Sequence, residues 1–107
     1  MNNVRLAGNL GKDPEIRSFD KGGKLATFSI ATKEEFYNKA GEKTSSTSWH
    51  NVAVWGKIAE RLQGAIHKGS YVSVEGRLQN RSYVDKNGQK RYITEVVATS
   101  VNFDSAA

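Results

Sequence analysis

Apolar residues alternate with polar ones along most of this chain, and this period of two constrains the fold more than any other feature. The alternation is clear over residues 4–10, where Val4, Leu6 and Leu10 are separated by polar or small residues, and it is typical of a half-buried strand. Further strand-like segments occupy residues 24–35, 49–55, 71–83 and 91–103, with a short extension at 16–19. The sequence therefore predicts a chain built mainly of strands.

One segment, residues 57–68, shows helical periodicity instead. Ile58, Leu62 and Ile66 recur every four residues, and Gly69 follows where the end of a helix favours a left-handed residue. A single helix between the third and fourth of five strands is the element order of the OB-fold, an all-β, partly open Greek-key barrel. Other small barrels would fit the strands alone, and the position of the helix favours the OB-fold.

The chain of 107 residues has room for one domain, 1–107, of which we expect about 3–104 to be structured. Residues 38–48 contain only small, polar and charged types, so we expect a mobile loop over 37–48. Asp85 to Gln89 includes an Asn-Gly pair, which is a strong hairpin-turn signal.

The charge balance favours an anionic partner. Sixteen Lys and Arg face 11 Asp and Glu, a formal net charge of +5, which favours nucleic acid first and acidic lipid second. No apolar run approaches the roughly 20 residues needed to cross a bilayer, and the N-terminus lacks the apolar region of a secretory signal. We therefore expect a soluble protein that is not exported and has no membrane partner.

Signals for catalysis are weak. The absence of cysteine excludes disulfides, thiol catalysis and cysteine-ligated zinc. His50 and His67 lack metal-ligand spacing, and the Gly-Lys pairs lack the other residues of a phosphate-binding loop. Acidic neighbours such as Glu34 and Glu35 lie among lysines, where a solvated sheet edge explains them. We expect no catalytic residue, no metal and no cofactor.

Four aromatic residues stand at strand ends or on a face that also carries polar and basic side chains: Phe36, Trp49, Trp55 and Tyr83. Single-strand binders use such rings to stack on bases while cations hold the backbone. The alternative, that the rings fill the core, stays open and is strongest for Trp55. The basic residues that we expect to hold phosphates are Lys33, Lys39, Lys43, Lys57, Arg77, Arg81, Lys86 and Arg91, with Lys90 close to them in the sequence.

Five segments resemble the bacterial single-stranded DNA-binding protein family in order and spacing, over about residues 3–104. They are VRLAGNLGKDPE (4–15), FSIAT (28–32), TSWHNVAVWGK (47–57), KGSYVSVEGRL (68–78) and RYITE (91–95). The resemblance implies an OB-fold that binds and protects single-stranded DNA without sequence preference during replication, recombination and repair. It also implies a homotetramer in the bacterial cytoplasm, associated with the nucleoid.

The resemblance assigns roles to particular residues. Phe36 and Trp49 match positions where the family places tryptophans that stack on bases. Trp55 matches a stacking aromatic, usually Phe, and Tyr83 matches a further Trp. Three of these four differ in identity but remain aromatic, so stacking should survive. His50 matches a position at a subunit contact, with an ordinary buried histidine as the alternative.

One departure from the family pattern concerns the end of the chain. Family members usually continue into a Gly/Pro/Gln-rich linker with an acidic tip that recruits replication and repair enzymes, whereas this sequence ends at residues 103–107 without one. The sequence fits both a truncated binding domain and a naturally short protein. Replication and repair proteins are possible partners, but the usual acidic-tail recruitment site is absent from this sequence.

Two rival functions remain. A primosome-type OB-fold protein that bridges replication proteins is similar in length, but such proteins generally lack the tryptophan pair of the third strand. A nuclease of OB-like fold would need clustered acids or histidines in its groove.

Overall fold

The computed structural model describes residues 1–103, which form six strands and one short helix. Their bounds are β1 (Val4–Leu10), β2 (Glu15–Ser18), β3 (Lys24–Tyr37), β4 (Lys43–Trp55), α1 (Lys57–Leu62), β5 (Tyr71–Val84) and β6 (Lys90–Phe103). The upper limit predicted for the structured range, residue 104, and the end of the chain at 104–107 lie outside the described residues.

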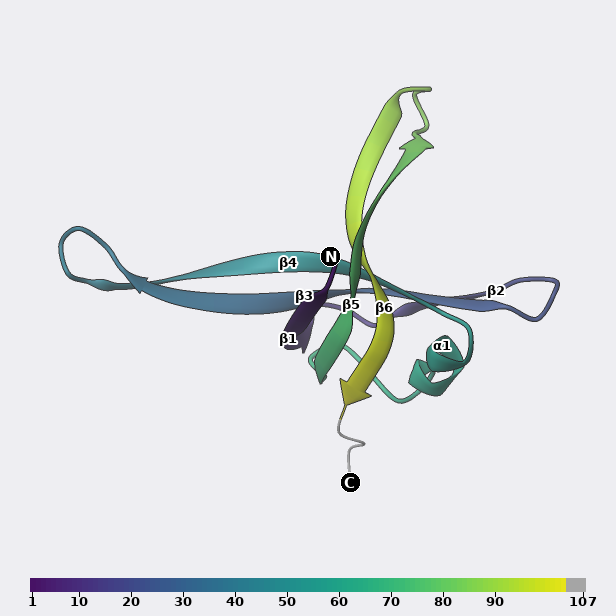
Figure 1. Ribbon diagram of the computed structural model, residues 1–107, viewed down its shortest axis with the longest axis horizontal. Helices are drawn as coiled ribbons and strands as arrows, with labels where there is room; N and C mark the ends of the chain where they lie inside the picture. The colour runs from purple at the N-terminus through teal and green to yellow at the C-terminus, as the bar shows by residue number, and fades with distance from the viewer. Residues whose placement is uncertain (104–107) are drawn as a thin grey trace.

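Five of the strands close into a barrel. β1 pairs with both β3 and β5, β5 pairs with β6, β6 runs parallel to β4, and β4 pairs with β3. β2, the short extension predicted at 16–19, adds to β3 outside this ring. The helix lies between β4 and β5 along the chain and contacts β3 and β4. This arrangement confirms the predicted OB-fold (Figure 1).

The barrel interior holds the hydrophobic core. Phe28 and Ile30 of β3 and Val52 and Val54 of β4 point inward with at most 4% of their surface exposed. Leu62 of α1 joins them. Burial of each such side chain contributes about 1.5–3 kcal/mol. Because strands alternate their faces, the intervening residues of β3 and β4 point outward.

The helix is shorter than predicted. It ends at Leu62 rather than at residue 68, because Gln63 is extended and Gly64 is left-handed with φ 76°. Ile66 is buried in the same core from the loop that follows. Its burial explains why the apolar spacing continues beyond the helix.

The prediction of a mobile loop over residues 37–48 is wrong for most of this segment. Residues 43–48 belong to β4 and pair with β3, from Thr32 opposite Ser48 to Tyr37 opposite Lys43. Only residues 38–42 form the turn. This part of the hairpin extends beyond the barrel and has no core to face, so its strands carry no apolar alternation.

Three hairpins project from the barrel as arms, and we name them the β2–β3, β3–β4 and β5–β6 arms (Figure 1). Their turns occupy residues 19–23, 38–42 and 85–89. In each turn the first N–H donates to the fifth carbonyl, at 2.8–3.0 Å, and the fourth residue is a glycine with φ between 77° and 84°. The arms give the molecule extents of 57 × 45 × 30 Å.

Candidate nucleic-acid interface

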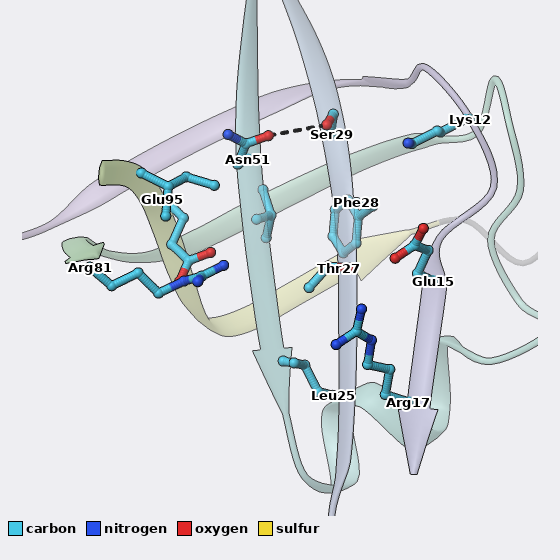
Figure 2. A pocket seen from close by; sticks show the side chains of 12 residues that line it. Lys12, Glu15, Arg17, Leu25, Thr27, Phe28, Ser29, Asn51, Arg81 and Glu95 are labelled. Atoms are coloured by element: carbon cyan, nitrogen blue, oxygen red, sulfur yellow. Dashed lines mark hydrogen bonds and ion pairs between the residues drawn. The ribbon is translucent and has the colours of Figure 1, made fainter. Parts of the chain in front are cut away.

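A groove of about 300 Å³ lies over the outer face of β3 and β4. Its floor includes Leu25, Thr27 and Ser29 of β3 and Asn51 of β4, and Ser29 Oγ donates a hydrogen bond of 3.3 Å to Asn51 Oδ1. Figure 2 shows Arg81 and Glu95 on one side of this floor and three other charged residues, Lys12, Glu15 and Arg17, on the other. The groove is thus polar, open and bordered by basic side chains.

The two tryptophans lie on the same outward face as the groove floor. On β4, Trp49 and Trp55 share the alternation of Asn51, and their partners on β3 are Ala31 and Leu25. They are 60% and 54% exposed, which contradicts the alternative that they fill the core. The two positions are six residues apart along the strand, a distance of about 20 Å. The tryptophans therefore stand near opposite ends of the groove.

Each tryptophan contacts a residue outside the set selected from the sequence. The ring of Phe19 stacks on Trp55 with centroids 5.8 Å apart and planes inclined by 21°. The indole of Trp49 lies against Gly11, where a Cβ atom would come within 2.5 Å of Cζ3. Phe19 could have been found from the sequence: Ile16 faces inward, so the alternation of a strand places Phe19, three residues later, on the outer face. The Gly11 contact has no comparable local signal.

Phe36 is exposed but does not join the tryptophan face. It pairs with Thr44 on β4 and has the opposite alternation to Trp49, so it lies on the other face of the β3–β4 arm. Its ring is 48% exposed. A role for Phe36 in stacking stays a prediction, and it would require DNA to contact both faces of this arm.

Tyr83 lies on the β5–β6 arm and is 47% exposed. It is opposite Arg91 and shares its face of β5 with Arg77 and Arg81. Because Arg81 also lines the groove, this face of the arm continues the groove wall outward. The structure thus brings Arg81 and Tyr83 onto the surface that carries Trp49 and Trp55.

Three of the predicted phosphate-binding residues are paired with carboxylates, each at 2.9 Å. Lys43 pairs with Glu35, Arg91 with Asp85 and Arg81 with Glu95. Glu95 is 7% exposed and is the one charged residue buried among residues 1–103, so the Arg81 pair offsets a desolvated charge in the groove wall.

The other predicted cations form no ion pair within residues 1–103. Lys39 and Lys86 lie in the turns of two arms, Lys57 begins α1, and Lys33 lies on β3. The structure does not gather them at one point. Two cations that do line the groove, Lys12 and Arg17, were missed because they are distant in sequence from the selected aromatics.

His50 lies on the inward-facing side of β4, opposite Ile30, and is half-buried. Its Nε2 atom is 2.8 Å from the hydroxyl of Thr32. Over residues 1–103, no group of three or more His, Asp or Glu side chains could hold a metal ion, and no helix could span a membrane.

Comparisons with known proteins agree on one family. The sequence matches the family described as "Single-strand binding protein family" over residues 1–104. The chain is similar to the SSB of Plasmodium falciparum, solved in complex with ssDNA, with 32% identity and a TM-score of 0.88; 96% of this chain and 94% of that chain are covered.

A second similar structure is a deletion variant of the single-stranded DNA binding protein from Thermus aquaticus. The identity is 28% and the TM-score 0.85, and 96% of this chain is covered. The match covers 50% of the Thermus aquaticus chain.

Proposed function

The chain belongs to the single-strand binding protein family, and from that premise we propose how it binds single-stranded DNA. Bases stack on exposed aromatic rings, while lysine and arginine side chains hold the phosphates without reading the sequence. The observation that carries this mechanism is the placement of Trp49 and Trp55, both more than half exposed, near opposite ends of a groove with basic residues on both sides.

The groove suits a single strand better than a duplex. Its floor is a sheet surface with an exposed indole toward each end, and an indole can stack only on a base whose face is free. In a duplex the bases already stack on each other, so the rings would have no partner. Binding should therefore favour single strands over duplexes of equal charge.

We propose that the biological role is to coat and protect single-stranded DNA during replication, recombination and repair. The protein would act by binding alone, without a catalytic residue or a cofactor, in the bacterial cytoplasm at the nucleoid. The rival bridging function is disfavoured by the same tryptophan pair, because a protein that mainly bridges others has no need of two exposed indoles at a groove.

A homotetramer is the proposed assembly, with His50 at a subunit contact. His50 is half-buried in the single chain and points away from the tryptophan face, so a contact there would leave the groove free. Analytical ultracentrifugation of the free protein tests this assembly. A monomer that persists at all concentrations would contradict it.

Titration of intrinsic tryptophan fluorescence with poly-dT, at low and moderate salt, tests the binding mechanism. Both tryptophans of the chain lie on the groove face, so a stacked base should quench strongly and the quenching should persist in moderate salt. Duplex DNA of equal charge serves as the control. Absent quenching, or equal binding to the duplex, would contradict stacking.

The variant Trp49→Ala should weaken poly-dT binding by about 1–3 kcal/mol, the usual value of one stacked base. Because the side chain is 60% exposed, the thermal stability should change little. Trp49→Phe is the matched control, since it keeps a ring and should retain part of the affinity. Global unfolding of Trp49→Ala would instead make Trp49 a core residue.

A further inference from the structure

One segment of the chain, residues 11–19, contacts both tryptophans. We propose that Gly11 and Phe19 are positioning residues, which hold the indoles of Trp49 and Trp55 in the orientation that accepts bases. This inference rests on the proposed stacking function, but the geometry that carries it is present in the free protein.

Gly11 provides space that the indole of Trp49 occupies. A Cβ atom at this position would lie 2.5 Å from Cζ3 and 2.8 Å from Cη2 of Trp49. Gly11 is not among the glycines with positive φ, so its backbone would accept alanine. The indole, and not the main chain, therefore requires glycine at this position.

Two other glycines show how specific this contact is. A Cβ atom on Gly8 or Gly76 would collide with the backbone of Ala31 or of Val97, so alanine there would distort the barrel. At Gly11 the nearby atoms belong to the far end of one side chain. Alanine at Gly11 should therefore displace the indole and leave the barrel intact.

The indole of Trp49 crosses a neighbouring strand to reach Gly11. Trp49 is on β4, and its partner on β3 is Ala31, while the N–H of Gly11 donates to the carbonyl of Ser29 on the far side of β3. The small side chain of Ala31 leaves room for this path. An indole fixed in this way loses less rotamer freedom when a base stacks on it.

Trp55 is held differently, by a stacked ring. Phe19 covers part of one indole face, with 5.8 Å between centroids, within the range preferred by offset aromatic pairs. The backbone of Phe19 is itself fixed by the β2–β3 turn. Its N–H donates to the carbonyl of Gly23 at 2.8 Å, and its carbonyl accepts from the N–H of Gly22 at 2.9 Å. A base can then approach the uncovered face of Trp55.

Between these two contacts the same segment lines the groove. Lys12 and Arg17 reach it from one side, where they can meet phosphates between the two stacked bases (Figure 2). The segment thus sets the orientation of both rings and supplies cations between them. Such preorganisation raises affinity by reducing what must be ordered on binding.

Single-tryptophan proteins provide the test for Gly11. Trp55→Phe leaves Trp49 as the only indole, because the chain has two tryptophans. In this background Gly11→Ala should change the emission spectrum of Trp49 in the absence of DNA and weaken poly-dT binding about 5- to 30-fold, a part of one stacking energy. Gly23→Ala is the control, since its Cβ would lie 4.0 Å from the nearest atom, in Phe19.

The corresponding test for Phe19 uses Trp49→Phe, which leaves Trp55 as the reporter. Phe19→Leu should alter the near-ultraviolet circular dichroism of Trp55 and raise its quenching by acrylamide, with about a 3- to 10-fold loss of affinity for poly-dT. Phe19→Tyr keeps the stacked ring and should restore both the spectrum and the affinity.

A double-mutant cycle separates positioning from a general structural effect. In a Trp49→Ala background, Gly11→Ala should have no further effect on affinity, because the indole that it displaces is gone. If Gly11→Ala reduced the affinity of Trp49→Ala by as much as it reduces that of a protein with Trp49, the proposal would be overturned. Unchanged indole spectra and unchanged affinity in both Gly11→Ala and Phe19→Leu would also overturn it. If the single-tryptophan proteins Trp55→Phe and Trp49→Phe do not bind poly-dT, the proposed function is contradicted. The spectra measured without DNA still show whether Gly11 and Phe19 orient the indoles.

Discussion

At the scale of single residues, carboxylates restrain several of the cations expected to meet DNA. Asp85 illustrates this in the β5–β6 turn, where its Oδ1 accepts from the N–H groups of Asn87 and Gln89 and its Oδ2 is 2.9 Å from Arg91 Nε. The Arg91 side chain first, and these backbone donors, lower the pKa of Asp85 below its ordinary value of 3.8. Arg91 is therefore held in place by Asp85 while 57% of its side chain stays exposed.

The variant Arg91→Ala should raise the pKa of Asp85 back towards 3.8, because the largest cause of the shift is removed. Because the pKa of Asp85 is lower in the folded state than in the unfolded state, the ionised carboxylate stabilises the folded protein above pH 3.8. This stabilisation is lost as the pH falls through the lowered pKa. Carbon-13 NMR titration of the Asp85 carboxyl group measures the change. An identical pKa in Arg91→Ala would mean that the backbone donors alone cause it.

At the scale of elements, one turn design builds all three arms. Asp20 to Gly23 and Asn87-Gly88 are recognisable as turns from the sequence, whereas Asn38 to Glu42 was predicted only as part of a longer loop. Gly41 nevertheless follows Asn38 at the same spacing as Gly88 follows Asp85. Asn38 Oδ1 accepts from the N–H groups of Ala40 and Glu42 as Asp85 does in its own turn. This spacing would have predicted the β3–β4 arm where the lack of apolar alternation suggested a loop.

The variant Gly41→Ala should loosen the β3–β4 arm without unfolding the barrel. Gly41 has φ 78°, and no atom lies within 4 Å of the place that a Cβ would take, so the cost is the left-handed backbone, about 1–2 kcal/mol. Hydrogen exchange should accelerate at residues 33–37 and 43–47, while the amides of Val52 and Val74 stay protected.

Gly41→Asn is the matched control for this variant, since asparagine adopts the left-handed conformation more readily than alanine. It should cause a smaller acceleration of exchange. Equal acceleration in the arm and in the barrel would show that the two fold as one cooperative unit.

At the scale of the whole molecule, the barrel could be predicted more completely than the interface. Local alternation and the position of one helical segment favoured the OB-fold, and the family resemblance supported the same fold. Alternation alone placed Trp49 and Trp55 on one face of β4. The contacts of Gly11 with Trp49 and of Phe19 with Trp55 join residues that are 38 and 36 positions apart. Such contacts depend on how the closed barrel places β1, β2 and β4 together, and no local pattern encodes them.

If bases stack in the groove and phosphates contact the arms, substitutions in the two places should change the salt dependence of DNA affinity in different ways. Lys39 and Lys86 lie in the turns of different arms and form no ion pair within residues 1–103. If both contact phosphates, the variant Lys39→Ala/Lys86→Ala should reduce the slope of log K against log salt by about 1.4, since each contact on a single strand contributes about 0.7. Trp49→Ala should instead lower affinity at every salt concentration and leave the slope unchanged, because stacking releases few ions.

Fluorescence titrations with poly-dT at four or more salt concentrations measure both slopes, with Trp55 remaining as a reporter in Trp49→Ala. A slope unaffected by the lysine pair would show that the arms do not contact phosphates and that the groove cations carry the charge interaction alone. A slope reduced by Trp49→Ala would show that losing one ring also shifts the backbone of the DNA, so that stacking and phosphate binding depend on each other. Parallel lines for Trp49→Ala and the wild type, together with a shallower line for the lysine pair, are the result expected when bases and phosphates are held by different parts of the fold.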